Sequence, residues 1–242
     1  MKKQMLYALC APPSPALAAP CLVTGVALTR AELEDHLSQS VRSFESCSFD
    51  DEDLSRLDLQ GCTFERCTFL GTILFACKMA GTSWLRCRAG GADLESVDAV
   101  DARFEGCDLN NTKWRRAKLA AASFRGCKLT GASFEEVAHL AVSFEQCLLV
   151  GADLRGFSFK KTTLKELDFS DAYLAGCDFR EAVFEGGSLR NATLKLAKFQ
   201  GADLRGTDIE GVKLTEAGLF KGAVISHAQA ASFMRELDLI VI

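Results

Sequence analysis

A large apolar residue returns at every fifth position of this chain, from Phe44 to Val224, without a change of register. Of the 37 positions in this series, 34 hold Phe, Leu, Trp, Tyr, Met, Ile or Val, and the exceptions are Ala89, Ala99 and His139. Two residues before each of these central positions, 32 of 37 residues are Ala, Cys, Gly, Thr or Val. A helix or an alternating strand would spread a five-residue period around its circumference. A chain that turns a corner every five residues would point both positions inward, which predicts a solenoid.

The repeated words identify the kind of solenoid. A-D-L-R-G occurs at 152–156 and again at 202–206, and C-D-F-R-E occurs at 177–181. This pattern resembles the pentapeptide-repeat family, A(D/N)LXX, over about three quarters of the chain. The resemblance implies an all-β, right-handed quadrilateral β-helix with four five-residue repeats per coil. The repeat region should then form about nine coils and, at about 4.8 Å between strands, a rod about 40 to 45 Å long.

The 20-residue period predicts that each side of the square stacks its own column of residues. One column should be richer in aromatic residues than the other three, and stacked rings are a favourable filling for such a core. Two stretches depart from the repeat, Leu85 to Ala102 and Val137 to Val142, and we expect both to be weak. The unbroken register makes large projecting loops unexpected. His139 is interpreted as a hydrogen-bonded or outward-turned core residue rather than as a functional site. The aromatic column comprises Phe44, Phe64, Trp84, Phe104, Phe124, Phe144, Leu164, Phe184 and Leu204.

Cysteine usage follows the same register. Nine of the 11 cysteines occupy the small inward position, and six of them, from Cys47 to Cys147, recur at every fourth repeat. Cysteine is small and apolar enough to fill the space beside large central residues. We therefore interpret these residues as core rather than as a redox or zinc site, and expect no metal and no cofactor. Many free thiols favour a reducing, cytoplasmic location.

The two ends of the chain differ from the repeat region. We divide the chain into an N-terminal tail with a possible capping helix (1–40), the β-helix (41–226), and a C-terminal helix with a dimerisation tail (227–242). Two capping-box patterns occur, Thr29-x-x-Glu32 and Ser226-x-x-Gln229. The first predicts a helix over Arg30 to Leu37, and the second predicts a helix that begins after Ser226 and extends to about Glu236. Residues 1–20 hold all four prolines and are interpreted as a loose tail, the alternative being a weak signal peptide and export. No apolar run is long enough to span a membrane.

No catalytic constellation is present in the sequence, so we expect a protein that is not an enzyme. The three histidines are scattered, and no nucleophile-elbow, HExxH or Walker motif occurs. Function should therefore lie in the surface of the rod. The net charge of −4 and the lack of a strongly basic patch argue against direct nucleic-acid binding.

Three surface features stand out. Outward positions of the aromatic side carry a row of acids, and residues 111–128 are locally basic. An uncharged strip comprises Ala80, Val100, Ala120 and Leu140. The acidic row is the candidate partner-binding surface, and it consists of Glu45, Glu65, Glu105, Glu145 and Glu185.

The C-terminus is similar to a particular group within the repeat family. Gly211-Val-Lys-Leu214 and residues 229–242 resemble the ends of the quinolone-resistance (Qnr) pentapeptide proteins. This resemblance implies a homodimer joined at the C-termini, whose rod imitates duplex DNA. It also implies binding to DNA gyrase or topoisomerase IV and protection from topoisomerase poisons, either fluoroquinolones or natural products. The alternative is a structural or scaffold protein for another macromolecular partner. The implied dimer interface comprises Phe233, Met234, Leu237, Leu239, Ile240, Val241 and Ile242.

Overall fold

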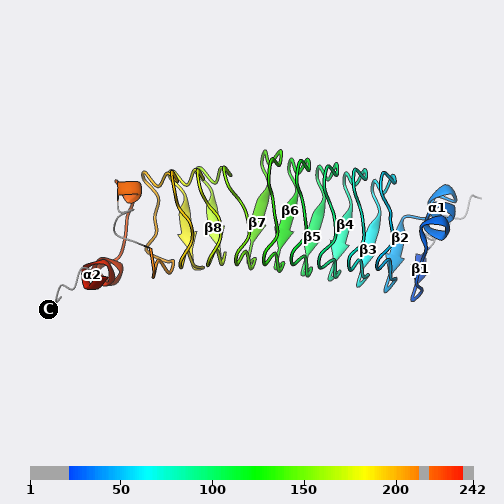
Figure 1. Ribbon diagram of the computed structural model, residues 1–242, viewed down its shortest axis with the longest axis horizontal. Helices are drawn as coiled ribbons and strands as arrows, with labels where there is room; N and C mark the ends of the chain where they lie inside the picture. Colours follow the sequence, from blue (N-terminus) through cyan, green and yellow to red (C-terminus); the bar gives the residue numbers. More distant parts are fainter. Residues whose placement is uncertain (1–21, 213–217, 237–242) are drawn as a thin grey trace, which may run out of the picture.

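The computed structural model describes residues 22–212 and 218–236, which form a rod of stacked coils with a helix near each end (Figure 1). One side of the rod is a nine-stranded parallel sheet, ordered as in the sequence from β1 to β9. The strands are β1 (Leu22–Thr24), β2 (Ser43–Glu45), β3 (Thr63–Glu65), β4 (Ser83–Leu85), β5 (Arg103–Glu105), β6 (Ser123–Arg125), β7 (Ser143–Glu145), β8 (Thr163–Lys165) and β9 (Val183–Glu185).

The strand register confirms four five-residue repeats per coil. Phe44 pairs with Phe64, and the same offset holds along the sheet to Leu164 and Phe184. Parallel bridges with this offset mark the other three sides of the square, for example Ser48 with Thr68, Asp53 with Ile73, and Asp58 with Lys78. The chain is therefore a four-sided parallel β-solenoid, as predicted. β1 also belongs to this sheet, so the solenoid begins within the segment assigned from the sequence to the N-terminal tail.

The corners of the square depend on a left-handed residue. Among the described residues, 21 non-glycine residues have a positive φ, such as Arg56 at 64° and Asn111 at 54°. Glycines such as Gly71 and Gly106 take the same conformation at other corners, so all four sides require it. A left-handed L-residue costs about 1 to 2 kcal/mol, so the hydrogen bonds and packing between coils must offset that cost at every corner.

The core is a set of stacked columns. In the aromatic column, the ring centroids of Phe104 and Phe124 are 4.8 Å apart with an interplanar angle of 5°, and those of Phe124 and Phe144 are 5.1 Å apart. Trp84 is also fully buried, and its Nε1 donates to Thr82 Oγ1 at 3.0 Å, so the indole leaves no unpaired polar group in the core.

The cysteines fill the core as predicted. The nine cysteines of the described chain are all buried and reduced. All of their thiols except that of Cys62 donate to carbonyl groups of the preceding coil, for example from Cys87 to Phe64 O at 3.3 Å. Burial raises the pKa of the Cys177 thiol to about 12 and that of Cys77 to about 11, so both stay protonated at neutral pH.

Both capping boxes are present. Helix α1 (Arg30–Ser38) begins after Thr29, whose side chain accepts from the Glu32 backbone N–H, and it buries Leu33 against the first coil. Helix α2 (His227–Glu236) begins after Ser226, whose Oγ accepts from Gln229 N at 3.2 Å. No helix of the described residues is long and apolar enough to cross a membrane.

Candidate protein-binding surfaces

The glutamate row lies on the outer face of the sheet. Its five members are the third residues of β2, β3, β5, β7 and β9, and their side chains are half-buried or exposed. Strand register sets Glu45 beside Glu65, but it sets Glu105 beside Arg125 and Glu185 beside Lys165. The sequence therefore placed the row correctly, and the structure shows that cations interrupt it.

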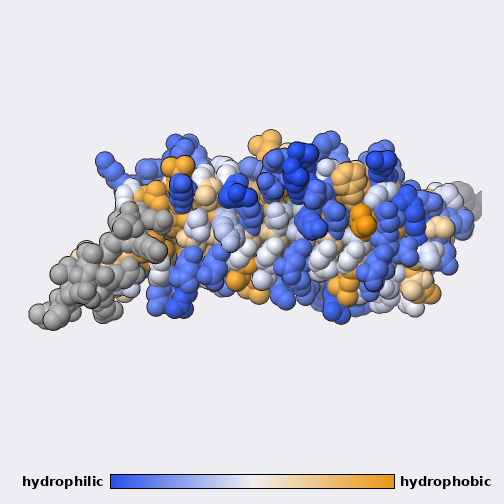
Figure 2. Space-filling view, viewed as in Figure 1, coloured by the Kyte–Doolittle hydropathy of each residue, from blue (hydrophilic) through white to orange (hydrophobic). Residues whose placement is uncertain are grey.

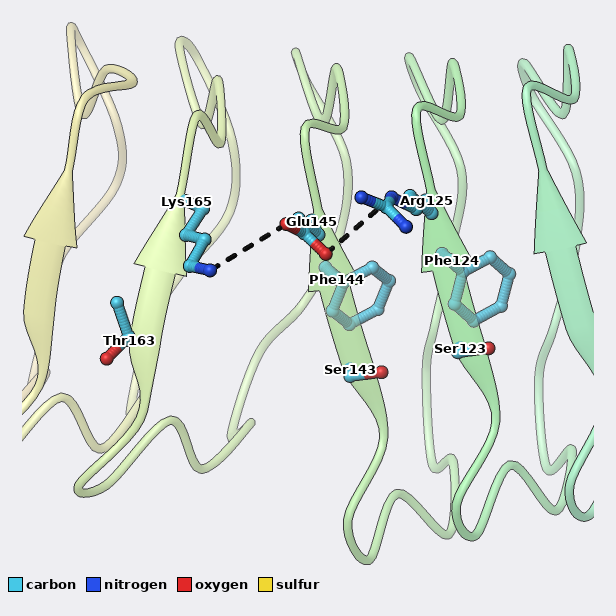
Figure 3. A pocket seen from close by; sticks show the side chains of 8 residues that line it. All are labelled: Ser123, Phe124, Arg125, Ser143, Phe144, Glu145, Thr163 and Lys165. Atoms are coloured by element: carbon cyan, nitrogen blue, oxygen red, sulfur yellow. Dashed lines mark ion pairs between the residues drawn. The ribbon is translucent and has the colours of Figure 1, made fainter.

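Several of these glutamates have a cationic neighbour. Arg66 contacts both Glu45 and Glu65. Glu145 lies between Arg125 and Lys165, at 3.8 and 3.9 Å (Figure 3). Among the described residues, Glu105 and Glu185 form no ion pair, and both are exposed. These two carboxylates are the most available members of the row.

Most cations of the basic segment at 111–128 form ion pairs with acids one coil away. Arg116 Nε lies 2.7 Å from Glu136 Oε2, and Lys118 Nζ lies 3.3 Å from Asp98 Oδ2. The hydrogen bond from Arg116 lowers the pKa of the Glu136 carboxyl. These exposed pairs add little stability individually. Opposite charges separated by one coil of sequence were the signal that could have revealed them. Figure 2 shows the resulting surface on one face, largely hydrophilic with separate apolar spots.

The uncharged strip ends at an exposed leucine. Ala80, Val100 and Ala120 are half-buried, whereas the Leu140 side chain is 81% exposed. Leu140 lies beside β7 and β8. In the described sheet, these are the only neighbouring strands that share a single register pair, Glu145 with Lys165.

At this place the backbone ladder is broken over one corner of the square. In the preceding coils, Leu119 N donates to Ala138 O at 2.8 Å and Ala121 N to Leu140 O at 2.9 Å. Among the described residues, the corresponding bonds from His139 N to Ser158 O and from Ala141 N to Lys160 O are absent. Bonds to the neighbouring coil are also absent for the N–H groups of Glu136, Ser158 and Thr163. We call this opening, between residues 136–145 and 155–165, the coil break.

Side-chain size explains the coil break. Phe157 occupies an inward position that usually holds a small residue, and its side chain is buried. Its ring stacks on His139 with centroids 4.2 Å apart and an interplanar angle of 13°. His139 Nδ1 lies 3.0 Å from Val137 O, and Ser158 N donates to Nε2 at 3.4 Å, so the imidazole replaces part of the lost ladder. Overpacking of this kind forces backbone to shift. The sequence interpretation of His139 as a hydrogen-bonded core residue agrees with this geometry.

The coil break opens two adjoining clefts. One, of about 550 Å³, is lined by His139, Leu140, Ala141, Val142, Ser158, Lys160 and Thr162. The other, of about 420 Å³, lies on the sheet face among β6, β7 and β8, and Figure 3 shows Thr163 set apart from Ser143. Sequence analysis missed Phe157 and Lys160 as site residues. The signal was a phenylalanine at a position where small residues predominate.

The proposed dimer residues are only partly described. Phe233 packs on the last coil, with its ring centroid 6.4 Å from that of Phe220, and Met234 is 41% exposed. Gln229 Nε2 ties α2 to the solenoid by donating to Leu204 O and Thr207 O, both at 2.7 Å. Leu237, Leu239, Ile240, Val241 and Ile242 lie outside the described residues.

Comparison with known families decides the assignment of the repeat. The model for the pentapeptide repeat region matches residues 36–114 and 97–168, and the model for eight pentapeptide repeats matches residues 177–215. The chain belongs to the pentapeptide-repeat family. No curated protein matches the sequence.

Solved structures of this family share the fold. A trypsin-treated variant of QnrB1, described as a plasmid-mediated fluoroquinolone resistance protein, matches with a TM-score of 0.62 at 20% identity, covering 82% of this chain and 99% of its own. A second trypsin-treated variant matches with a TM-score of 0.55 at 18% identity, covering 93% and 100%. Full-length QnrB1 matches with a TM-score of 0.51 at 20% identity, covering 90% and 97%. At this identity the likeness concerns the fold.

Proposed function

We propose that this protein binds DNA gyrase or topoisomerase IV and protects the enzyme from poisons that trap the cleaved DNA complex. One observation carries the proposal. A rod that covers 97 to 100% of three structures of a fluoroquinolone resistance protein continues into a C-terminal sequence that resembles the Qnr family. The solenoid offers an elongated surface rather than an enclosed catalytic cleft, and this favours action by binding.

Charge limits how the rod could imitate DNA. A duplex about 40 Å long carries about 24 phosphate charges, whereas the net charge of this chain is −4. General electrostatic attraction therefore cannot substitute for a duplex. Mimicry would depend on the width of the rod and on particular carboxylates, of which Glu105 and Glu185 are the most available.

The proposed active form is a homodimer joined at the C-termini. Helix α2 is held to the last coil by Gln229 and Phe233, while Met234 stays exposed. The sequence after α2 is Leu-Asp-Leu-Ile-Val-Ile, which is apolar enough to form the centre of an interface. A two-fold interface at this end would double the length of the rod.

A supercoiling assay tests the function. Gyrase inhibited by a fluoroquinolone should regain supercoiling activity when the protein is added, with a drug-free reaction as the control. Glu105→Lys should weaken this rescue. Glu95→Lys changes the net charge equally on another side of the rod, and it should leave rescue unchanged. The function is contradicted if the unaltered protein rescues neither supercoiling by gyrase nor decatenation by topoisomerase IV. Equal losses in the two variants contradict the glutamate face alone.

A scaffold role for another protein is the second candidate. It is favoured by the exposure of Leu140 at the end of the uncharged strip. Leu140→Ser separates the two candidates, because it should leave gyrase rescue intact if the strip serves a different partner.

A further inference from the structure

The two edges of the coil break carry backbone groups whose equivalents in neighbouring coils form hydrogen bonds between coils. One edge holds the N–H groups of His139 and Ala141, and the other holds the N–H of Thr163. Facing carbonyl groups, those of Ser158 and Lys160, accept no backbone hydrogen bond within the described chain. Unpaired groups at strand spacing are a template for an added strand, the mode of recognition called β-strand addition.

The surroundings of these groups are apolar on one side. Leu140 is 81% exposed and continues the uncharged strip into the coil break. Thr162 is exposed, although the equivalent inward residues Thr82 and Thr112 are both 1% exposed. An apolar side chain entering the coil break would cover this opened edge of the core and remove it from water.

The other side of the cleft is cationic. Lys160 lines it, is exposed, and forms no ion pair with any described residue. Its neighbours are already compensated, since Lys161 lies 3.5 Å from Glu181 and Arg180 lies 2.6 Å from Asp178. The uncompensated charge of the cleft is therefore positive, and a carboxylate complements it.

We propose that the coil break binds an extended segment of a partner protein that carries a carboxylate next to an apolar side chain. The segment would add as a strand along the unpaired groups, with its apolar side chain against Leu140 and its carboxylate at Lys160. Residues 1–20 of this chain are a poor occupant, because they contain no Asp or Glu and all four prolines. Proline cannot donate to a strand ladder.

Peptide binding to the full chain tests this proposal. The probe is a fluorescein-labelled seven-residue peptide that alternates valine with glutamate, measured by fluorescence anisotropy. A version with lysine in place of glutamate, and a version with alternate amides N-methylated, should each bind at least about tenfold more weakly, which corresponds to about 1.4 kcal/mol. Lys160→Glu should reverse the charge preference, and Lys198→Glu, on the same side of the rod but away from the coil break, should not.

A closed variant provides the second arm. The double substitution His139→Leu, Phe157→Ala restores the usual residue types at both positions and should close the coil break. It should abolish peptide binding and slow hydrogen exchange in segments 136–145 and 155–165. The proposal is overturned if no probe binds, if both charges bind equally, or if the closed variant binds as tightly as the unaltered chain. Self-association that is lost in the closed variant, without peptide binding, would assign the coil break to a second copy instead.

Discussion

Two regions of this rod depart from the repeat, and they respond in opposite ways. Between Leu85 and Ala102, two alanines stand where large residues are usual, and the coils remain bonded. Ala89 N donates to Asp108 O at 2.8 Å, and Ala99 N donates to Lys118 O at 2.9 Å. The expectation of a weak place there is wrong. Around His139 the departure adds volume at Phe157, and the coils separate.

The difference teaches that this solenoid accepts missing volume more readily than added volume. Trp84 and Trp114 lie within one coil's length of the two alanines, and both are fully buried. The Trp84 ring centroid lies 4.6 Å from that of Phe69, which belongs to the same column as Ala89. A large neighbour can thus occupy the space that a small centre leaves. No neighbour can withdraw from an oversized residue except by moving the backbone, which is already held at strand spacing.

The largest effect is expected from creating a second overfilled coil. Ala117→Phe places a phenylalanine at an inward position of a regular coil, where Ala117 is fully buried. We expect a loss of about 3 kcal/mol in the free energy of unfolding, measured by urea denaturation. Hydrogen exchange should quicken at the ladder from Lys118 to Ala121. The control is Arg116→Phe, which adds a ring at an exposed position. A stable variant with unchanged exchange would show that volume alone does not open coils.

The compensation by tryptophan can be broken in a double-mutant cycle. Trp84→Leu should cost about 3 kcal/mol of unfolding free energy, because it empties space shared with Ala89. Ala89→Leu alone should also destabilise, by about 2 kcal/mol, since the indole already fills that space. Together the two changes should cost less than their sum. Simple additivity in thermal or urea unfolding would mean that the two positions do not share volume.

Closing the coil break should have a smaller effect in the stabilising direction. The double variant His139→Leu, Phe157→Ala restores ladder hydrogen bonds, each with a net worth of about 1 kcal/mol, and it loses the packing of one buried ring. We expect a gain of about 2 kcal/mol in urea denaturation. Destabilisation would show that the stack of Phe157 on His139 supports the fold more than the ladder does.

At neutral pH the smallest effect is expected from the buried thiols, because their contribution to stability changes only above about pH 9. The folded pKa of Cys177 is about 12, against an ordinary value of 9.0. Its contribution to stability is complete below about pH 9 and is lost as pH rises toward 12, by about 1.4 kcal/mol per unit. Cys177→Ala should remove this slope from urea unfolding curves at pH 8 to 11. Cys77→Ala, remote from the coil break, should remove a similar slope up to its pKa of about 11. A slope unchanged in both variants would mean that burial does not hold these thiols protonated.

The sequence was sufficient for the fold because its signals are local and repeat. Five-residue spacing predicted the sides, the 20-residue column predicted the strand register, and Thr29 and Ser226 predicted both helix starts. It was less informative for the surface. Ion pairs such as Arg116 with Glu136 depend on which charges become neighbours one coil apart. Phe157 was not recognised from the sequence, because a large residue at an inward position leaves the five-residue spacing unchanged although it disturbs the packing.

The strand register has a consequence for how the length of the rod can evolve. Each coil contacts only the coils before and after it, so its fit does not depend on its place along the rod. Loss or duplication of the codons for one coil would therefore keep the strand register of the remaining coils and change the length by one strand spacing, about 4.8 Å. The length of a rod of this architecture can therefore evolve in steps of one coil, independently of the surface chemistry of each coil.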